Sequence, residues 1–120
     1  MKPIYKIFSA YLLVILFILL ANTSFGQKIC KEDICVVEFN AGWNDKNSVN
    51  YLDSLTDCGI KRISIDKGDW AKEYNITVVP TIIVFNGKEV ERFKADLSFS
   101  MTAKLEDIQD IIDDINMEDF

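Results

Sequence analysis

The chain has 120 residues, of which 49% are hydrophobic, and a formal net charge of −6 at pH 7. It contains no histidine, which excludes imidazole both as a general base and as a metal ligand. All 19 Asp and Glu residues lie after residue 26, so the rest of the chain is acidic and lacks the basic patch that nucleic-acid binding requires. We therefore expect no metal, no other cofactor and no nucleic-acid partner.

The first 26 residues have the features of an export signal. A basic start precedes an apolar run over residues 7–21, which is shorter than the roughly 20 residues of a membrane span. Small residues then occupy the two positions that a signal peptidase reads, which places the cut before Gln27. We predict that residues 1–26 are a signal peptide, that residues 27–120 form one domain, and that this domain is exported, either periplasmic or secreted. The alternative is an uncleaved segment that anchors the domain to a membrane through residues 7–21.

The first part of the domain alternates strands and helices. Residues 35–41 are rich in β-branched and aromatic side chains, which predicts a buried strand. From residue 45 onwards apolar side chains recur every three residues up to Gly59, which predicts an amphipathic helix that ends at this glycine. Its apolar positions are Val49, Leu52, Leu55 and Cys58. Residues 60–65 read as a second strand, and Asp69 can cap a short helix over residues 70–74. This order predicts parallel pairing of the two strands.

A hairpin and a closing helix complete the predicted domain. Residues 77–85 and 88–93 read as two strands joined by Asn86-Gly87, a strong signal for an antiparallel hairpin. A last helix over residues 99–115 has apolar positions at steps of four and three. These positions are Met101, Leu105, Ile108, Ile112 and Ile115. The other face of this helix is acidic, and we interpret it as solvated; docking to a partner subunit is the alternative.

Three segments resemble parts of the thioredoxin family. The segment VVEFNAGW, residues 36–43, resembles the strand that ends in a tryptophan before the family's active-site motif. The segment SIDKGDWAKEYNI, residues 64–76, resembles the next strand end and short helix, and VVPTIIVFNGKEV, residues 78–90, resembles the strand that a cis-proline opens. The resemblance extends over about residues 35–115 and implies an α/β, minimal thioredoxin-like fold. We expect a central mixed sheet of about four strands with flanking helices.

The resemblance places Asn44 and Asn47 where the family has its two redox cysteines. In the family, unpaired N–H groups and the dipole at a helix N-terminus stabilise a thiolate, which attacks a substrate disulfide. The second cysteine then resolves the mixed disulfide. An amide has neither a thiolate nor a redox couple, so the family's reaction cannot run here and we expect no catalytic residue. Instead, we expect Asn44 or Asp45 to cap the helix.

Three cysteines, Cys30, Cys35 and Cys58, lie elsewhere in the chain. This odd number in an exported chain predicts one disulfide and one free thiol. The spacing leaves the pairing open between a short Cys30–Cys35 loop and a bond from Cys58 to either of the others. Because the strand leads away from Cys35 and the helix returns, we expect all three at the end of the domain opposite the family's active site. A structural disulfide is the favoured interpretation, and a relocated redox pair is the alternative.

The resemblance also implies a binding edge for an extended peptide. The family has a cis peptide bond before the proline at the position of Pro80, and the adjoining backbone pairs with an extended substrate chain. By this comparison Trp43, Val79, Pro80 and Thr81 would form the docking edge. The alternative is that these residues have only a structural role.

Glu38 falls where thioredoxins keep a buried carboxylate beneath the reactive cysteines. In the family this carboxylate serves in proton transfer. With no thiol at the adjacent position, we expect Glu38 to be partly buried and paired with Lys61 or Arg62, or to point to a solvated edge.

These observations together predict a redox-inactive, exported protein with a thioredoxin-like fold, which acts as a binding or chaperone-like module for an extended peptide or a protein partner. The missing cysteine pair argues against an enzyme without excluding one. The alternative function is a thiol-disulfide oxidoreductase that uses a non-standard pair among the three remaining cysteines.

Overall fold

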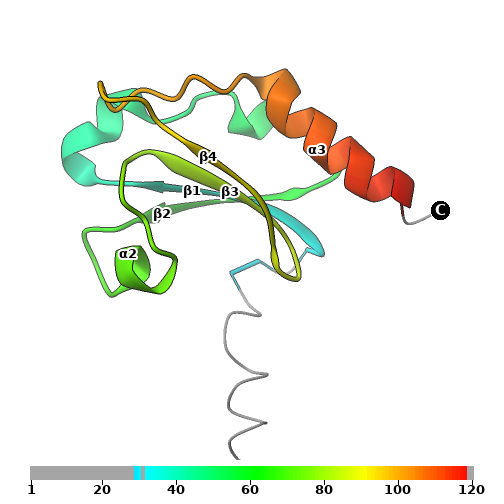
Figure 1. Ribbon diagram of the computed structural model, residues 1–120, viewed down its shortest axis with the longest axis horizontal. Helices are drawn as coiled ribbons and strands as arrows, with labels where there is room; N and C mark the ends of the chain where they lie inside the picture. Colours follow the sequence, from blue (N-terminus) through cyan, green and yellow to red (C-terminus); the bar gives the residue numbers. More distant parts are fainter. Residues whose placement is uncertain (1–28, 31, 119–120) are drawn as a thin grey trace, which may run out of the picture.

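The computed structural model describes residues 29–30 and 32–118, and the signal peptide predicted over residues 1–26 lies outside this part. Four strands form one mixed sheet in the order β2-β1-β3-β4 (Figure 1). The strands are β1 (Ile34–Asn40), β2 (Gly59–Ser64), β3 (Thr81–Asn86) and β4 (Glu89–Lys94). β1 runs parallel to β2 and antiparallel to β3, and β3 pairs antiparallel with β4. This mixed sheet with helices on both faces confirms the predicted α/β fold.

β1 lies inside the sheet, and all seven of its residues are buried. Successive side chains of a strand point to opposite faces, so β1 contributes to two separate cores. Val36 belongs to the core on one face, whereas Val37 and Phe39 belong to the core on the other. The near-continuous apolar sequence of this strand is therefore explained by burial on both faces.

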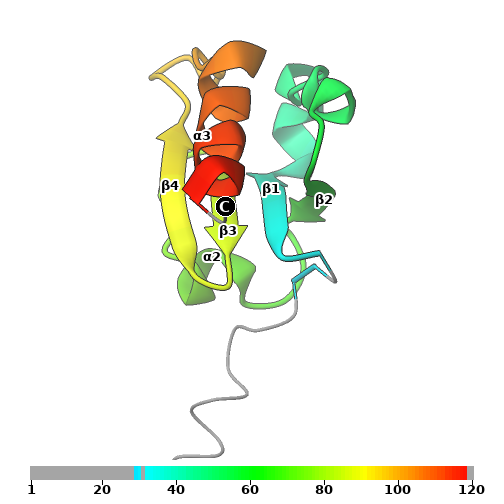
Figure 2. The ribbon, with the colours of Figure 1, turned by 90° about the vertical axis from the view of Figure 1, so that its right-hand side faces the viewer.

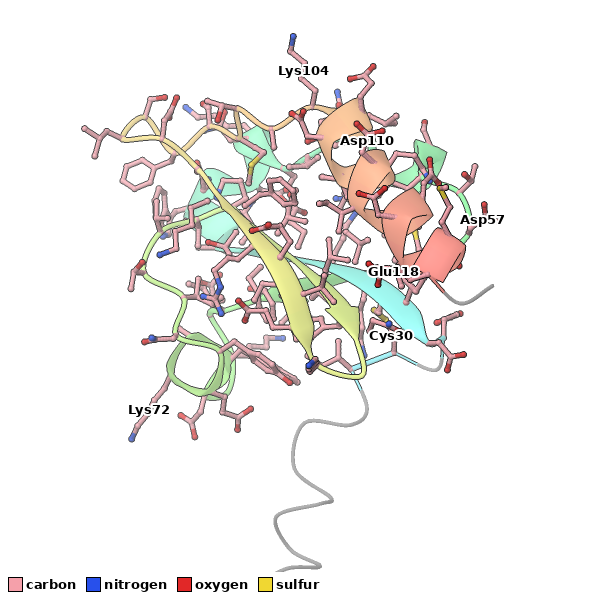
Figure 3. All side chains as sticks on the ribbon, turned by 45° about the vertical axis from the view of Figure 1, so that its right-hand side comes forward. Cys30, Asp57, Lys72, Lys104, Asp110 and Glu118 are labelled. Atoms are coloured by element: carbon pink, nitrogen blue, oxygen red, sulfur yellow. A yellow bond between two sulfur atoms is a disulfide. The ribbon has the colours of Figure 1, made fainter. Side chains whose placement is uncertain are left out.

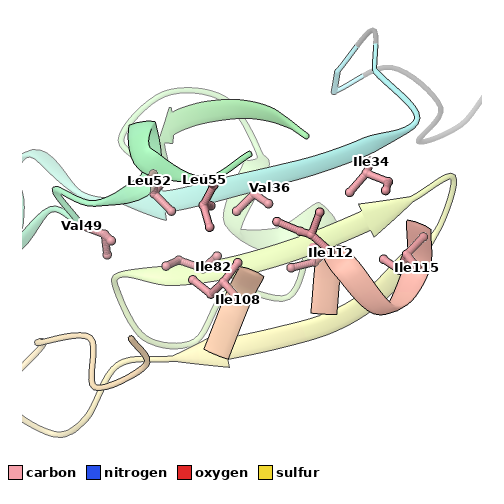
Figure 4. Close-up of a cluster of buried hydrophobic side chains, with 10 residues drawn as sticks. Ile34, Val36, Val49, Leu52, Leu55, Ile82, Ile108, Ile112 and Ile115 are labelled. Atoms are coloured by element: carbon pink, nitrogen blue, oxygen red, sulfur yellow. The ribbon is translucent and has the colours of Figure 1, made fainter. Parts of the chain in front are cut away.

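The helix α3 (Leu105–Glu118) lies across the face that we call the α3 face, and Figure 2 shows it in front of the sheet. Ile108, Ile112 and Ile115 point from the helix into the core drawn in Figure 4. The helix starts later than predicted, because Phe99 has a positive φ of 62° and precedes a non-helical segment. No helix in the described part of the chain is both long enough and apolar enough for a membrane span.

The opposite face, which we call the α2 face, is covered by the four-residue helix α2 (Trp70–Glu73) and by the chain that leads into β1. Its buried core consists of Cys35, Val37, Phe39, Ile63 and Ile83. The predicted short helix is confirmed, although Asp69 makes no side-chain cap hydrogen bond.

The helix predicted from residue 45 to residue 58 is wrong. Two short 3₁₀ helices, η1 (Gly42–Asn47) and η2 (Leu52–Ser54), occupy this connection instead. An apolar period of three departs from the 3.6 residues per turn of an α-helix, and of the four apolar residues only Leu52 lies within one of the two 3₁₀ helices. The segment is also rich in Asn, Asp and Ser, whose side chains compete for backbone hydrogen bonds. Ser48, with a ψ of 141°, separates the two turns.

Removal of a core side chain from α3 tests this packing. Ile108 is fully buried, so Ile108→Ala leaves a cavity and should lower the free energy of unfolding by about 2–5 kcal/mol. Asp110→Ala on the exposed side of α3 is the control and should change it by less than about 0.5 kcal/mol. Urea unfolding followed by circular dichroism measures both, and equal effects would contradict the assigned orientation of α3.

Candidate functional site

Asn44 is the centre of a buried hydrogen-bond network at the carboxyl end of β1, where it is 2% exposed. Its Nδ2 lies 3.1 Å from Asn40 Oδ1, 3.1 Å from the carbonyl oxygen of Phe99 and 3.4 Å from that of Val79. Asn47 Nδ2 donates to Asn44 Oδ1 at 2.8 Å. One side chain thus connects the end of β1 to the segment before β3 and to the loop after β4.

The network corrects the predicted cap. The N-cap residue of η1 is Ala41, and no side-chain cap hydrogen bond forms there, so neither Asn44 nor Asp45 caps a helix. An asparagine side chain has both a strong donor and a strong acceptor, and Asn44 uses both. The two asparagines at the family's cysteine positions therefore join three segments of the backbone.

The predicted docking edge is accessible only in part. Trp43 is 64% exposed, and its ring meets Phe99 edge-on with 5.0 Å between the ring centroids. Val79, Pro80 and Thr81 are buried, and the Val79–Pro80 peptide bond is cis. The carbonyl group of Val79 already accepts a hydrogen bond from the amide network. Trp43 thus remains open to solvent, whereas the backbone beside it is engaged within the domain.

Truncation of Asn44 tests the network. Asn44→Ala leaves buried backbone and side-chain groups without partners and should lower the free energy of unfolding by about 1–3 kcal/mol. Asn50→Ala is the matched control, because Asn50 is exposed and should change the free energy by less than about 0.5 kcal/mol. Denaturant unfolding measures both values; a neutral effect of Asn44→Ala would count against the network.

Glu38 is buried and forms an ion pair with one of its two expected partners, the more exposed Arg62. Its Oε1 lies 2.9 Å from Arg62 Nη1, and its Oε2 accepts the backbone N–H of Val49 at 2.6 Å. Lys61 instead donates to the carbonyl group of Ile29. Glu38 and Arg62 also line a cavity of about 240 Å³. Both carboxylate oxygens of Glu38 are thus used within the domain, and no thiol lies among the groups that bind them.

A disulfide joins Cys30 to Cys35 at the other end of β1, where Figure 3 marks Cys30. The two Cα atoms are 6.0 Å apart, within the usual range for a disulfide. Cys35 is 3% exposed, whereas Cys30 is only half-buried. Cys35 is the second residue of β1 and Asn40 is the last, so five residues and about 16 Å of strand separate the disulfide from the amide network.

Cys58 is a free, half-buried thiol that directly precedes β2. The next residue, Gly59, is the partner of Cys35 in the β1–β2 ladder. The three cysteines thus lie at one end of the sheet, as expected, but on different faces. Cys58 packs against the α3-face core, whereas the disulfide belongs to the α2 face. Burial raises the pKa of the Cys58 thiol, and the carboxylates of Asp57 and Glu32 raise it further.

The raised pKa makes a prediction about alkylation. At neutral pH a raised pKa leaves less thiolate, so iodoacetamide should modify Cys58 several-fold more slowly in the folded chain than in urea. Glu32→Gln removes one of the two carboxylates and should accelerate the folded-state reaction, whereas Glu91→Gln on β4 should not. Mass spectrometry of timed samples measures these rates. Equal rates in the folded and unfolded chains would be the contrary result.

Comparisons with known proteins identify the fold. No protein-family model and no curated protein matches the sequence. Solved structures do match: thioredoxin from Plasmodium falciparum has a TM-score of 0.55 at 20% identity over 75% of this chain and 89% of its own. Thioredoxin from Schistosoma mansoni has a TM-score of 0.54 and 24% sequence identity, over 72% of this chain and 81% of its own. Mitochondrial thioredoxin 3 from Saccharomyces cerevisiae has a TM-score of 0.53 and 21% sequence identity, over 77% of this chain and 88% of its own. The chain has a thioredoxin-like fold.

The prediction of a redox-inactive module is contradicted by two findings taken together. The structure contains a Cys-x-x-x-x-Cys disulfide between Cys30 and Cys35, and the fold that carries it is that of thioredoxins. The error came from one assumption, that loss of the cysteines at Asn44 and Asn47 removes redox chemistry from the whole domain. A pair at the opposite end of β1 is not affected by that loss. These findings favour the alternative, a thiol-disulfide oxidoreductase with a non-standard cysteine pair.

Proposed function

We propose that this protein is a thiol-disulfide oxidoreductase-like module whose redox pair is Cys30 and Cys35. The observation that carries the proposal is the pairing of a half-buried cysteine, Cys30, with a buried one, Cys35, in a single disulfide. Exchange requires an accessible sulfur that a partner thiolate can reach and a second sulfur that can leave and later return. Cys30 suits the first role and Cys35 the second.

The reaction follows from these roles. A thiolate of a reduced partner attacks Sγ of Cys30, the Cys30–Cys35 bond breaks, and Cys35 leaves as a thiolate. A second thiolate of the partner then attacks the partner's first sulfur, which is bonded to Cys30 in the mixed disulfide. This releases Cys30 as a thiolate and leaves the partner with a disulfide. In the reverse direction, the Cys30 thiolate attacks a partner disulfide and Cys35 resolves the intermediate. Each cycle transfers two electrons and needs no cofactor.

We further propose that the domain works after export, in a periplasmic or secreted setting, with residues 1–26 as its signal or anchor. Disulfides persist in oxidising compartments, which is consistent with a disulfide in a domain of this size. The partner would be a protein or peptide that carries a cysteine pair.

Reduction of insulin by dithiothreitol tests the proposal with the purified full-length chain and three single variants. The wild-type chain and Cys58→Ser should accelerate the reaction, because Cys58 lies outside the pair. Cys30→Ser should fall to the rate without protein, since it removes the sulfur that meets the partner. Cys35→Ser should accumulate a mixed disulfide with insulin that gel electrophoresis detects. Loss of activity in Cys58→Ser, or a wild-type rate at background, would refute the assignment.

A further inference from the structure

The α2 face beside the disulfide presents apolar side chains that the domain itself covers only in part. Within the described residues, the helix on this face has a single turn, α2, compared with the 14 residues of α3 on the opposite face. Several hydrophobic side chains pack against its core and remain half-buried. They are Ile29, Cys30, Ile65, Trp70, Tyr74, Ile76 and Phe85. Cys30, the less buried cysteine of the proposed redox pair, is thus part of an apolar surface.

Three aromatic rings on this surface form a row that begins at the disulfide. Phe85 is the cross-strand partner of Cys35 and shares its face of the sheet. The ring of Tyr74 lies 5.8 Å from that of Phe85, and the ring of Trp70 stacks on Tyr74 at 6.0 Å. We call Phe85, Tyr74 and Trp70 the aromatic row. All three are half-buried, so each ring keeps part of its surface open to solvent.

The aromatic row is held in place from β4. Arg92 donates to the carbonyl group of Tyr74 at 2.8 Å and to that of Asn75 at 3.0 Å. The same guanidinium pairs with Glu89 at 2.7 Å. These bonds fix the turn after α2 against the sheet, so a ligand would meet a preformed surface and would not have to order it.

We infer that the aromatic row binds an apolar side chain of the substrate polypeptide while the substrate's cysteine reacts at Cys30; this inference rests on the proposed function. The exchange reaction brings the substrate sulfur to the end of the row, which selects a cysteine-containing chain as the occupant. The two ring-to-ring distances along the row, 5.8 and 6.0 Å, together equal the length of about three or four extended residues. The preferred substrate therefore carries an aromatic or large aliphatic residue within that distance of its cysteine.

The opposite end of the domain is the competing location. Trp43 and Leu97 are exposed there, on the side of the amide network. β1, with about 16 Å of strand after Cys35, leads to that end, whereas a side chain three residues from the cysteine of an extended peptide lies only about 10 Å from it.

The test uses the oxidised full-length chain and two synthetic peptides of equal length and charge, each with one cysteine. One peptide has Phe three residues from the cysteine, and the other has Ser at that position. Quenched-flow mass spectrometry gives the rate of mixed-disulfide formation for each, and dithiothreitol gives a reference rate without any peptide contact. We expect the Phe peptide to react roughly two- to tenfold faster than the Ser peptide.

Variants assign that preference to a surface. Phe85→Ala and Trp70→Ala should each reduce the ratio of the two peptide rates towards one. Trp70→Ala removes the ring at the far end of the row, so it still tests the inference if Phe85→Ala does not fold. Leu97→Ala is the matched control, an exposed apolar residue at the other end, and should keep the ratio. A ratio of one in the wild type, or a preference lost in Trp43→Ala and kept in Phe85→Ala, would overturn the inference. No reaction of the disulfide even with dithiothreitol would instead refute the proposed function.

Discussion

The complete burial of β1 is the constraint on which the rest of the structure depends. The strand pairs with β2 on one side and β3 on the other, and its alternate residues enter two cores. Such a strand has no solvent-facing side at which to place a reactive group. The residues that lead into and out of β1, such as Cys30 and Trp43, are therefore the ones that reach solvent.

The two ends have taken different roles. At the carboxyl end, buried amides connect three segments of the chain, and the satisfied hydrogen bonds of Asn44 stabilise that arrangement. At the amino end, Cys35 enters the sheet while Cys30 stays half-buried outside it. A buried amide without partners would be costly, so the first end is specified closely by its contacts. The second end is covered less completely, and this leaves Cys30 and a row of aromatic rings half-buried.

The site could be predicted only in part from the sequence. The odd number of cysteines indicated one disulfide and one free thiol, because bond formation needs pairs. That Cys30 pairs with Cys35 and not with Cys58 could be seen only in the fold, because the spacing of cysteines along the chain does not show on which face of the sheet each one lies. Asn40 and Phe99, which bind Asn44, left no signal in the sequence, because one closes an apolar strand and the other contributes its backbone carbonyl group. The ion pair of Glu38 with Arg62 was anticipated, because a buried carboxylate needs a partner.

The sequence by itself determined the order of the strands along the chain, the hairpin at Asn86-Gly87 and the apolar side of α3. These features arise from local patterns, in which each residue's neighbours along the chain decide its conformation. Only the tertiary structure decided that the connection after β1 folds as two 3₁₀ turns, and on which faces of the sheet the disulfide and Cys58 lie. The placement of the cysteines depends on contacts between residues far apart in the sequence. In the connection after β1, Asn, Asp and Ser side chains locally disfavour an α-helix, and the hydrogen bonds of Asn44 to Val79 and Phe99 hold the observed conformation. The energies of such contacts outweigh local propensities, and no single segment contains them.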